Sequence, residues 1–513
     1  MNVNLNRVAD APVVSTRYGK IQGIWQDGGS AAYLGIPYAA PPVGQLRFLP
    51  PHPPEPWEGI RTTAEYGPTP QRRPFGDVTT IPEPSIPGDD ILNLNVFTPA
   101  PRDRLAKLPV LVWIHGGGYF AGSPASPWYN GRSFNHHGVV FVTLSYRLGF
   151  DGFGWMEGAP LNRGLLDQIA ALRWVKDNIR EFGGDPDRVT IAGQSAGGGS
   201  VLSLLASPKA EGLFQSAIAV SSAFGWPTAN DVAEVGRGLS AHLGIAPTID
   251  AWRTIPHERI LDVEREWNHL PGSPTASSVD ELLTAMRTGL DRATGLAFRP
   301  VLDGDVLVHS LDHPTTQQRI AHIPIIIGST RNEFSFPSPA DAPGLDEICE
   351  ILARHGVADA AIERFAHDTW RIGEERALGQ FMTSFMFRNE IARFAELRNR
   401  AGAGTRTWLY DFAELAANAQ GSFHCLDLPY FFNQLDAPNV AKVLGPNPSQ
   451  PLADAMHGTW IEFLKHGRLP YPSTEDNPCG AIHFQGGAEF RPDAYFFERE
   501  LLAAVGQWPG LPD

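Results

Sequence analysis

The stretch Val189-Thr-Ile-Ala-Gly-Gln-Ser-Ala-Gly-Gly-Gly-Ser200 decides the fold of this 513-residue chain. Four strand-forming residues lead into Gly193-Gln-Ser195-Ala-Gly197, and small residues then begin a predicted helix over 200–205. The Gly-x-Ser-x-Gly pattern is typical of a nucleophile elbow, a sharp strand-to-helix turn that holds its serine in a strained backbone conformation. In a chain with 52 glycines the pattern alone is weak. Its place between a predicted strand and a predicted helix gives it weight.

Several continuous apolar runs predict further buried strands. They are 108–114, 139–145 and 407–412, and the segment 323–333 is predicted to be a further buried strand that ends in a polar turn. Helical periodicity separates these runs, which favours an α/β protein with a central, mostly parallel sheet and helices on both faces. We expect one domain over 1–513, in which the segments 226–322 and 335–405 are helical insertions that line the substrate pocket.

Two segments are predicted to lack such regularity. The prolines between residues 33 and 48 predict an extended, anchored loop and argue against a central strand. After a helix predicted at 456–465, the chain is expected to finish in short strands and loops.

Composition restricts the kind of partner. A formal net charge of −15 argues against nucleic acid, which requires a basic face. Three cysteines do not make a disulfide framework in so long a chain. The first ten residues contain no apolar signal segment, and no apolar run approaches membrane-spanning length. We therefore expect a cytoplasmic protein without a membrane partner. The oligomeric state is not visible in the sequence.

A nucleophilic serine requires a base to take its proton and an acid to orient that base. On a fold with this elbow, the order along the chain is serine, acid, histidine. Glu333 follows a predicted strand by a short turn, and His424 lies in a loop after the last clear strand, 407–412. Asp303 and Asp305, also at a turn, are rivals to Glu333 at this point.

A second motif, His115-Gly-Gly-Gly118, ends the predicted strand 108–114. Consecutive glycines let the backbone present N–H groups to a substrate oxygen without a side chain in the way. Gly117 and Gly118, together with the N–H of Ala196, are therefore the candidate oxyanion donors.

The ordered blocks of the chain resemble the type-B carboxylesterase family over nearly its whole length. The matching blocks are 35–44, 92–97, 109–118, 145–149, 162–197 and 423–432. The resemblance implies the α/β-hydrolase fold, a Ser195–Glu333–His424 triad, and Ser221 as a serine behind that triad that hydrogen-bonds near Glu333. We therefore expect hydrolysis of small-molecule carboxylic esters, extending to aryl carbamates or activated amides, through an acyl-enzyme at Ser195. This chemistry needs no metal or organic cofactor. The block at 421–429 is similar to bacterial members that cleave aryl carbamates such as phenmedipham.

The chain departs from the family pattern in the block Asp89-Asp-Ile-Leu92, which no cysteine precedes. The loop disulfide of secreted relatives is therefore not expected. The residues between Gly59 and Leu92 include no tryptophan, so a cation–π site for quaternary ammonium is not expected either. Two other functions use the same fold: a non-catalytic binding protein that has lost its triad, and an acyltransferase that uses the same residues.

Overall fold

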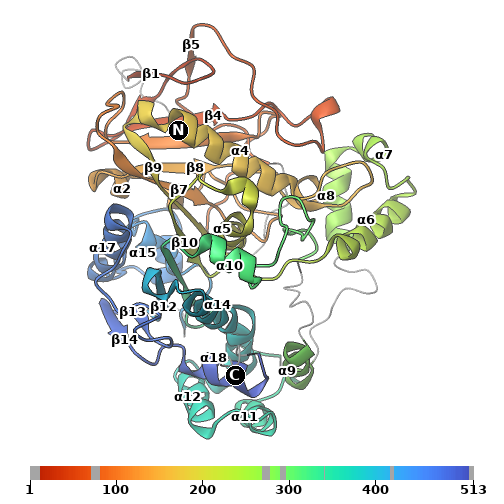
Figure 1. Cartoon of the computed structure of the whole chain (residues 1–513), viewed down its shortest axis with the longest axis vertical. Coiled ribbons are helices and arrows are strands. Elements are labelled where there is room, and N and C mark those ends of the chain that lie inside the picture. Colours follow the sequence, from red (N-terminus) through yellow and green to blue (C-terminus); the bar gives the residue numbers. More distant parts are fainter. Residues whose placement is uncertain are drawn as a thin grey trace. The chain divides into compact units, whose positions relative to one another are not determined.

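The structure is a computed structural model that describes residues 12–70, 81–267, 278–288, 296–339, 341–415 and 421–507. The first ten residues, in which no signal segment is expected, lie outside these ranges. Parts of the predicted insertions also lie outside them. The chain forms two compact units (Figure 1). The first contains Met1–Ile218, Trp226–Ser273 and Gly295–Ser310, and the second contains Ala219–Gly225, Pro274–Thr294 and Leu311–Asp513.

The first unit is built on a mixed sheet. Its central strands β8, β7 and β9 are parallel, whereas β6, β4 and β3 continue the sheet in antiparallel pairs. The strands are β3 (Ile24–Trp25), β4 (Ala31–Pro37), β6 (Asn93–Thr98), β7 (Leu108–Ile114), β8 (Val140–Leu144) and β9 (Gly184–Gln194). The strands β1 (Val13–Ser15), β2 (Lys20–Gln22) and β5 (Ile60–Thr62) form a separate small sheet.

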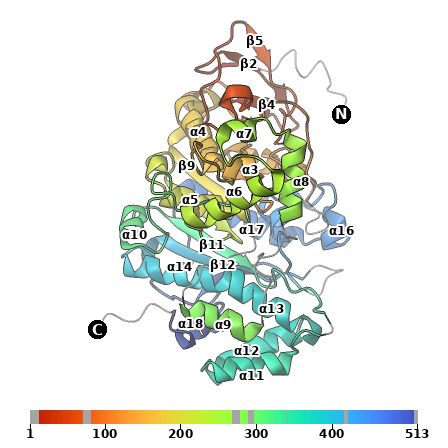
Figure 2. The ribbon, with the colours of Figure 1, turned by 90° about the vertical axis from the view of Figure 1, so that its right-hand side faces the viewer.

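Helices cover both faces of this parallel core. The chain passes from β7 to its neighbour β8 through α2, and from β8 to β9, on the other side of β7, through α3 and α4. The two crossovers run in opposite directions and share the right-handed sense, so their helices lie on opposite faces. The helices of this unit are α2 (Arg132–His136), α3 (Gly149–Phe153), α4 (Arg163–Asn178), α5 (Ala196–Ala206), α6 (Ala229–Leu243), α7 (Ile249–Arg253) and α8 (His257–Trp267). Figure 2 shows α6, α7 and α8 grouped together.

The division between the units falls within β10 (Ser216–Val220). In the second unit β11 and β13 flank β12 in parallel, and β14 adds an antiparallel edge. These strands are β11 (Ile325–Thr330), β12 (Thr407–Phe412), β13 (Ala481–Phe484) and β14 (Ala488–Arg491). The predicted α/β class with parallel central strands is therefore confirmed.

The second unit is rich in helices, several of which Figure 2 shows stacked beside one another. They are α9 (Val279–Thr288), α10 (Pro314–Ile320), α11 (Leu345–Arg354), α12 (Asp359–Trp370), α13 (Ala377–Thr383), the π-helical turn η7 (Ser384–Arg388), α14 (Asn389–Arg400), α15 (Leu428–Phe431), α16 (Val440–Leu444), α17 (Gln450–His466) and α18 (Phe496–Ala504). Among the described residues, no helix is both long and apolar enough to cross a membrane.

Two predictions are wrong. Residues 31–37 form the buried strand β4, which pairs with both β3 and β6. Its proline, Pro37, is tolerated because it is the last residue of the strand, where the ladder is ending. The C-terminal part of the chain also forms the helix α18, in which Glu498 accepts hydrogen bonds from Ser384 and Arg388.

Candidate active site

Ser195 occupies the turn between β9 and α5, with φ of 59° and ψ of −123°. A residue with a side chain stays in this region only when its surroundings impose it. The carbonyl of Ser195 accepts the N–H of Gly199 at 2.8 Å, which places the serine at the start of the helix. Ala196 is the first helical residue, and the N–H groups of a first helical turn have no intrahelical acceptor.

The glycines of the elbow are required by close backbone contacts. A Cβ at Gly193 would lie 2.4 Å from the carbonyl oxygen of Gly197. A Cβ at Gly197 would lie 2.1 Å from the carbonyl oxygen of Ile114, the last residue of β7. The strand, the helix and the end of β7 therefore meet without space for a side chain.

The glycine-rich loop after β7 runs beside this serine. A Cβ at Gly116 would lie 3.1 Å from the Cβ of Ser195. Gly117 has φ of 110° and Gly118 has φ of 60°, both in the left-handed region that favours glycine. The carbonyl of Gly117 accepts the N–H groups of Phe120 at 3.1 Å and Ala121 at 2.8 Å, which closes a tight turn. The predicted oxyanion donors and the predicted nucleophile thus lie in one part of the first unit.

Glu333 and His424 lie together in the second unit. Nδ1 of His424 and Oε2 of Glu333 form a hydrogen bond, and the side chains are 6% and 0% exposed. The other carboxylate oxygen of Glu333 accepts the N–H of Thr330, the last residue of β11, at 2.9 Å. Both oxygens of the carboxylate are therefore held, and the imidazole is oriented by one of them.

Burial and two neighbouring side chains act on the pKa of His424 in opposite directions. Burial by itself would lower the pKa of His424, but contacts with Cys425 and Glu333 outweigh it and raise the pKa well above its ordinary value. Burial raises the pKa of the Cys425 thiol, so this group is neutral near pH 7. The carboxylate of Glu333 is therefore the charge that stabilises imidazolium.

Asp427 is a buried carboxyl that sequence reasoning did not select. Burial, with the neighbouring charge of Glu333, raises the pKa of Asp427 to about 7. One of its oxygens accepts the hydroxyl of Tyr410 at 3.1 Å. Its only signal in the sequence is its position three residues after His424.

Ser221 lies on the path between β10 and the helices that follow. It has φ of 45°, and its N–H donates to the carbonyl of Gly328 in β11 at 2.8 Å. Among the described residues, the buried hydroxyl has no hydrogen-bond partner. The predicted hydrogen bond near Glu333 is therefore not among its contacts, although β11, to which its backbone is tied, leads to Glu333.

The rival acids have structural contacts of their own in the first unit. Oδ1 of Asp303 accepts the N–H groups of Asp305, Val306 and Leu307 at 3.0, 2.8 and 2.9 Å. Oδ2 of Asp303 accepts Nδ2 of Asn162 at 2.8 Å. Asp305 forms an ion pair with Lys209 at 2.9 Å and is largely exposed. These contacts give Asp303 the role of stabilising its own turn.

Comparisons with known proteins indicate one protein family over most of the chain. A family model described as the carboxylesterase family matches residues 10–485. Para-nitrobenzyl esterase of Bacillus subtilis is 34% identical and covers 92% of each chain. Phenmedipham hydrolase of Pseudarthrobacter oxydans is 32% identical and covers 94% of this chain and 97% of its own. A solved structure of PNB esterase superposes with a TM-score of 0.78 at 30% identity, covering 96% of this chain and 99% of its own. The predicted α/β-hydrolase fold is confirmed by this likeness.

Proposed function

The chain belongs to the carboxylesterase family and is a carboxylic ester hydrolase, and from this membership we propose that it acts through an acyl-enzyme formed at Ser195. The observation that carries the proposal is the strained turn at Ser195, which joins β9 to α5 beside the glycine-rich loop. Strain of this kind costs about 1–3 kcal/mol and is typical of functional positions.

In the first half-reaction, Oγ of Ser195 bonds to the carbonyl carbon of the ester while Nε2 of His424 accepts the hydroxyl proton. The N–H groups of Gly117, Gly118 and Ala196 donate to the resulting oxyanion. Loss of one such donor costs roughly 3–4 kcal/mol of transition-state stabilisation. Collapse of the intermediate breaks the bond to the alcohol oxygen, which leaves with the proton from His424.

In the second half-reaction, water takes the place of the alcohol. His424 accepts a proton from water as its oxygen attacks the acyl carbon, and the same proton then returns to Oγ of Ser195. Glu333 holds the imidazole tautomer and stabilises the imidazolium that forms in each half-reaction. Ser221 supports the position of Glu333, because its backbone N–H is hydrogen-bonded to β11, the strand that leads to Glu333.

Aromatic side chains next to His424 support a preference for aryl or other apolar groups in the substrate. The ring centroids of Phe334 and Phe387 each lie 5.4 Å from that of His424. An apolar group of the substrate that packs on these rings is removed from water at the point where the proton is transferred. The helical segments 226–322 and 335–405 are proposed to line the rest of the pocket.

Aryl carbamates are proposed as a second substrate class. The support is the 32% identity to phenmedipham hydrolase over nearly the whole of both chains. A carbamate presents the same carbonyl to Ser195, so the same residues can form a carbamoyl-enzyme. A reducing, cytoplasmic location is proposed as well, because Cys349, Cys425 and Cys479 form no disulfide among the described residues.

The experiment compares wild type with Ser195→Ala on p-nitrophenyl acetate, butyrate and octanoate and on an aryl carbamate, in buffer with EDTA. We expect turnover by wild type and loss of turnover in the variant, with no effect of EDTA. The dependence on acyl chain length gives a first measure of the pocket. Turnover that survives in Ser195→Ala would contradict the acyl-enzyme. Release of a new ester when an alcohol is added would show acyl transfer by the same residues.

A further inference from the structure

The turn that carries Glu333 is packed against one face of α13. Gly379, Gln380 and Thr383 lie on this face. A Cβ at Gly379 would lie 2.4 Å from the carbonyl oxygen of Phe334, so the helix approaches the turn as closely as its backbone allows. Oγ1 of Thr383 accepts the N–H of Phe334 at 3.1 Å.

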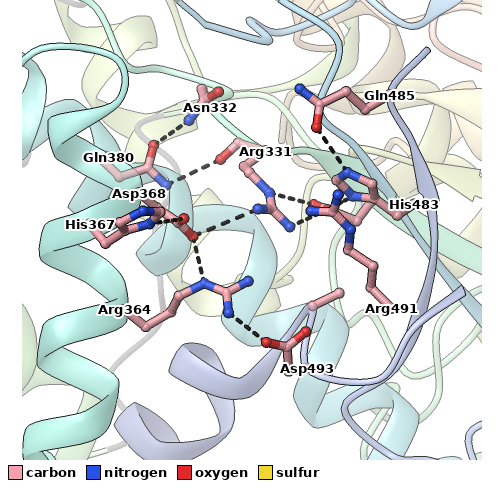
Figure 3. A network of polar contacts seen from close by, with 12 residues as sticks. Arg331, Asn332, Arg364, His367, Asp368, Gln380, His483, Gln485, Arg491 and Asp493 are labelled. Atoms are coloured by element: carbon pink, nitrogen blue, oxygen red, sulfur yellow. Dashed lines mark hydrogen bonds and ion pairs between the residues drawn. The ribbon is translucent and has the colours of Figure 1, made fainter. Parts of the chain in front are cut away.

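Gln380 makes three hydrogen bonds to this turn. Its Oε1 accepts Nδ2 of Asn332 and the hydroxyl of Ser335, each at 2.8 Å. Its Nε2 donates to the carbonyl of Arg331 at 3.2 Å. Figure 3 shows the side chain of Gln380 between Asn332 and Arg331. One amide therefore holds the residues on both sides of Glu333.

Asn332 extends the contact to the loop of His424. Its Oδ1 accepts the N–H of Ser422 at 3.0 Å, and its own N–H donates to the carbonyl of Ser422 at 3.2 Å. The side chain of Asn332 thus connects Gln380 on one side with the histidine loop on the other. Asn332 is 2% exposed and Gln380 is 5% exposed, so neither can replace a lost partner with bulk water.

We propose that Gln380 is a positioning residue that, through Asn332, fixes the turn of Glu333 and the loop of His424 relative to each other. Gln380 touches none of the reacting atoms and acts through the residues that it holds. The inference rests on the proposed function, in which Glu333 orients His424. It gives the segment 335–405 a second role, because one face of its helix α13 braces the acid.

Glutamine suits this position because three groups of the turn converge on it. Asn332 and Ser335 each present a donor, and the carbonyl of Arg331 presents an acceptor. A primary amide offers an acceptor oxygen and a donor nitrogen at the same point. The guanidinium of Arg331 is held separately, by Asp411 in β12 and, at 3.7 Å, by Asp368 in α12. Removal of the amide leaves the buried groups unsatisfied, and the turn must move to satisfy them.

The test compares wild type, Gln380→Leu and a matched control, Gln317→Leu, on p-nitrophenyl butyrate. Gln317 is a buried glutamine in α10 whose Nε2 donates to the carbonyl of Leu311 at 2.6 Å. Both substitutions remove a buried amide, but only one removes contacts to the acid turn. We expect Gln380→Leu to lower kcat about 10- to 100-fold with little change in KM, since misplacement of catalytic groups acts on the transition state. The control is expected to keep the wild-type kcat.

A pH profile separates positioning from general destabilisation. The titratable groups that act on His424 are Glu333, Cys425 and Asp427. Displacement of Glu333 weakens its hold on imidazolium, so the acid limb of kcat/KM should move to lower pH in Gln380→Leu. A loss of folded protein would lower the rate without moving this limb. Thr383→Val removes the acceptor for the N–H of Phe334 and the hydroxyl's own hydrogen bond to the carbonyl of Gly379 within α13. Because it leaves the three contacts of Gln380 in place, it should move the limb in the same direction by less.

Ser195→Ala, assayed in parallel, distinguishes the two proposals. If Ser195→Ala is inactive while folded Gln380→Leu matches Gln317→Leu in kcat and acid limb, the positioning role is wrong and the proposed function stands. If Gln380→Leu does not fold, a folded Thr383→Val with wild-type kcat and acid limb also overturns it. Turnover by Ser195→Ala would overturn the proposed function itself.

Discussion

The backbone N–H of His424 donates to the carbonyl oxygen of Glu333 at 3.0 Å, in addition to the hydrogen bond between their side chains. The two residues are 91 positions apart in the chain. The main-chain hydrogen bond holds the two backbones together whatever the rotamers of the side chains, and the side-chain hydrogen bond then orients the imidazole. The imidazole of His424 is therefore oriented by the backbone of the fold as well as by the carboxylate of Glu333.

Substitution of Glu333 by glutamine is expected to lower kcat about 10³- to 10⁴-fold, since the neutral amide no longer stabilises imidazolium. The matched control is Asp303→Asn, which changes the rival acid. Asp303 accepts three N–H groups of its own turn, so this variant should lose stability and keep kcat. Rates are measured on p-nitrophenyl butyrate and stability by urea unfolding. A larger loss of kcat in Asp303→Asn would transfer the acid's role to Asp303.

The activity of wild type is expected to fall as the pH decreases, with a midpoint above the ordinary histidine value of about 6.5. Contacts with Cys425 and Glu333 raise the pKa of His424, and only the neutral imidazole can accept the proton of Ser195. The acid limb of kcat/KM, measured in a pH-stat, should move to lower pH in Glu333→Gln. A limb that stays in place in this variant would show that Glu333 does not act on His424.

Ser195→Gly is expected to be more stable than Ser195→Ala by about 1–2 kcal/mol, although both are inactive. Alanine keeps the Cβ at φ of 59°, whereas glycine adopts this conformation without strain. Glycine also gains entropy in the unfolded chain, which reduces the difference. Urea midpoints of the two variants provide the measurement. Equal stability would mean that the elbow stores no strain that depends on a side chain.

The sequence was sufficient to predict those elements whose structure is determined by a local pattern of residues. The runs Leu108–Ile114 and Thr407–Phe412 are strands, with the bounds that their apolar residues predicted. The elbow at Ser195 was also recognisable, because glycines are required on both sides of it. The strand β4 was missed because its proline was weighed as a breaker, although Pro37 lies where the strand ends.

The contacts around Glu333 could not be predicted in this way. Gln380 follows Asn332 by 48 positions, and a buried amide has no motif of its own. Only the packing of α13 on the turn brings the two amides together. The residues Glu333 and His424 were selected by chain order and family resemblance, and their catalytic roles remain predictions that the variants above test.

Glu264→Gln is expected to be more stable than wild type above about pH 8 and to differ little from it near pH 5. The gain in the free energy of unfolding above pH 8 should be about 1–3 kcal/mol. Oε1 of Glu264 accepts the N–H of Phe150 at the start of α3 at 2.6 Å. Gly149, the preceding residue, donates to the carbonyl of Tyr119, which follows the glycine-rich loop, at 2.7 Å. Glutamine keeps an acceptor for Phe150 and cannot ionise.

The sign follows from the pKa of Glu264, which is raised to about 7 because burial, together with the charge of Asp151, outweighs the opposing effects of the Phe150 N–H and His257. The unfolded chain releases this proton near pH 4.3, so stability falls as the pH rises from about 4.3 to 7. Urea unfolding at about pH 5 and pH 8.5 measures the difference between wild type and variant. Glu258→Gln, an exposed position on the same helix α8, is the control and should show the same difference at both pH values. A constant difference for Glu264→Gln as well would show that Glu264 is ionised across the whole range.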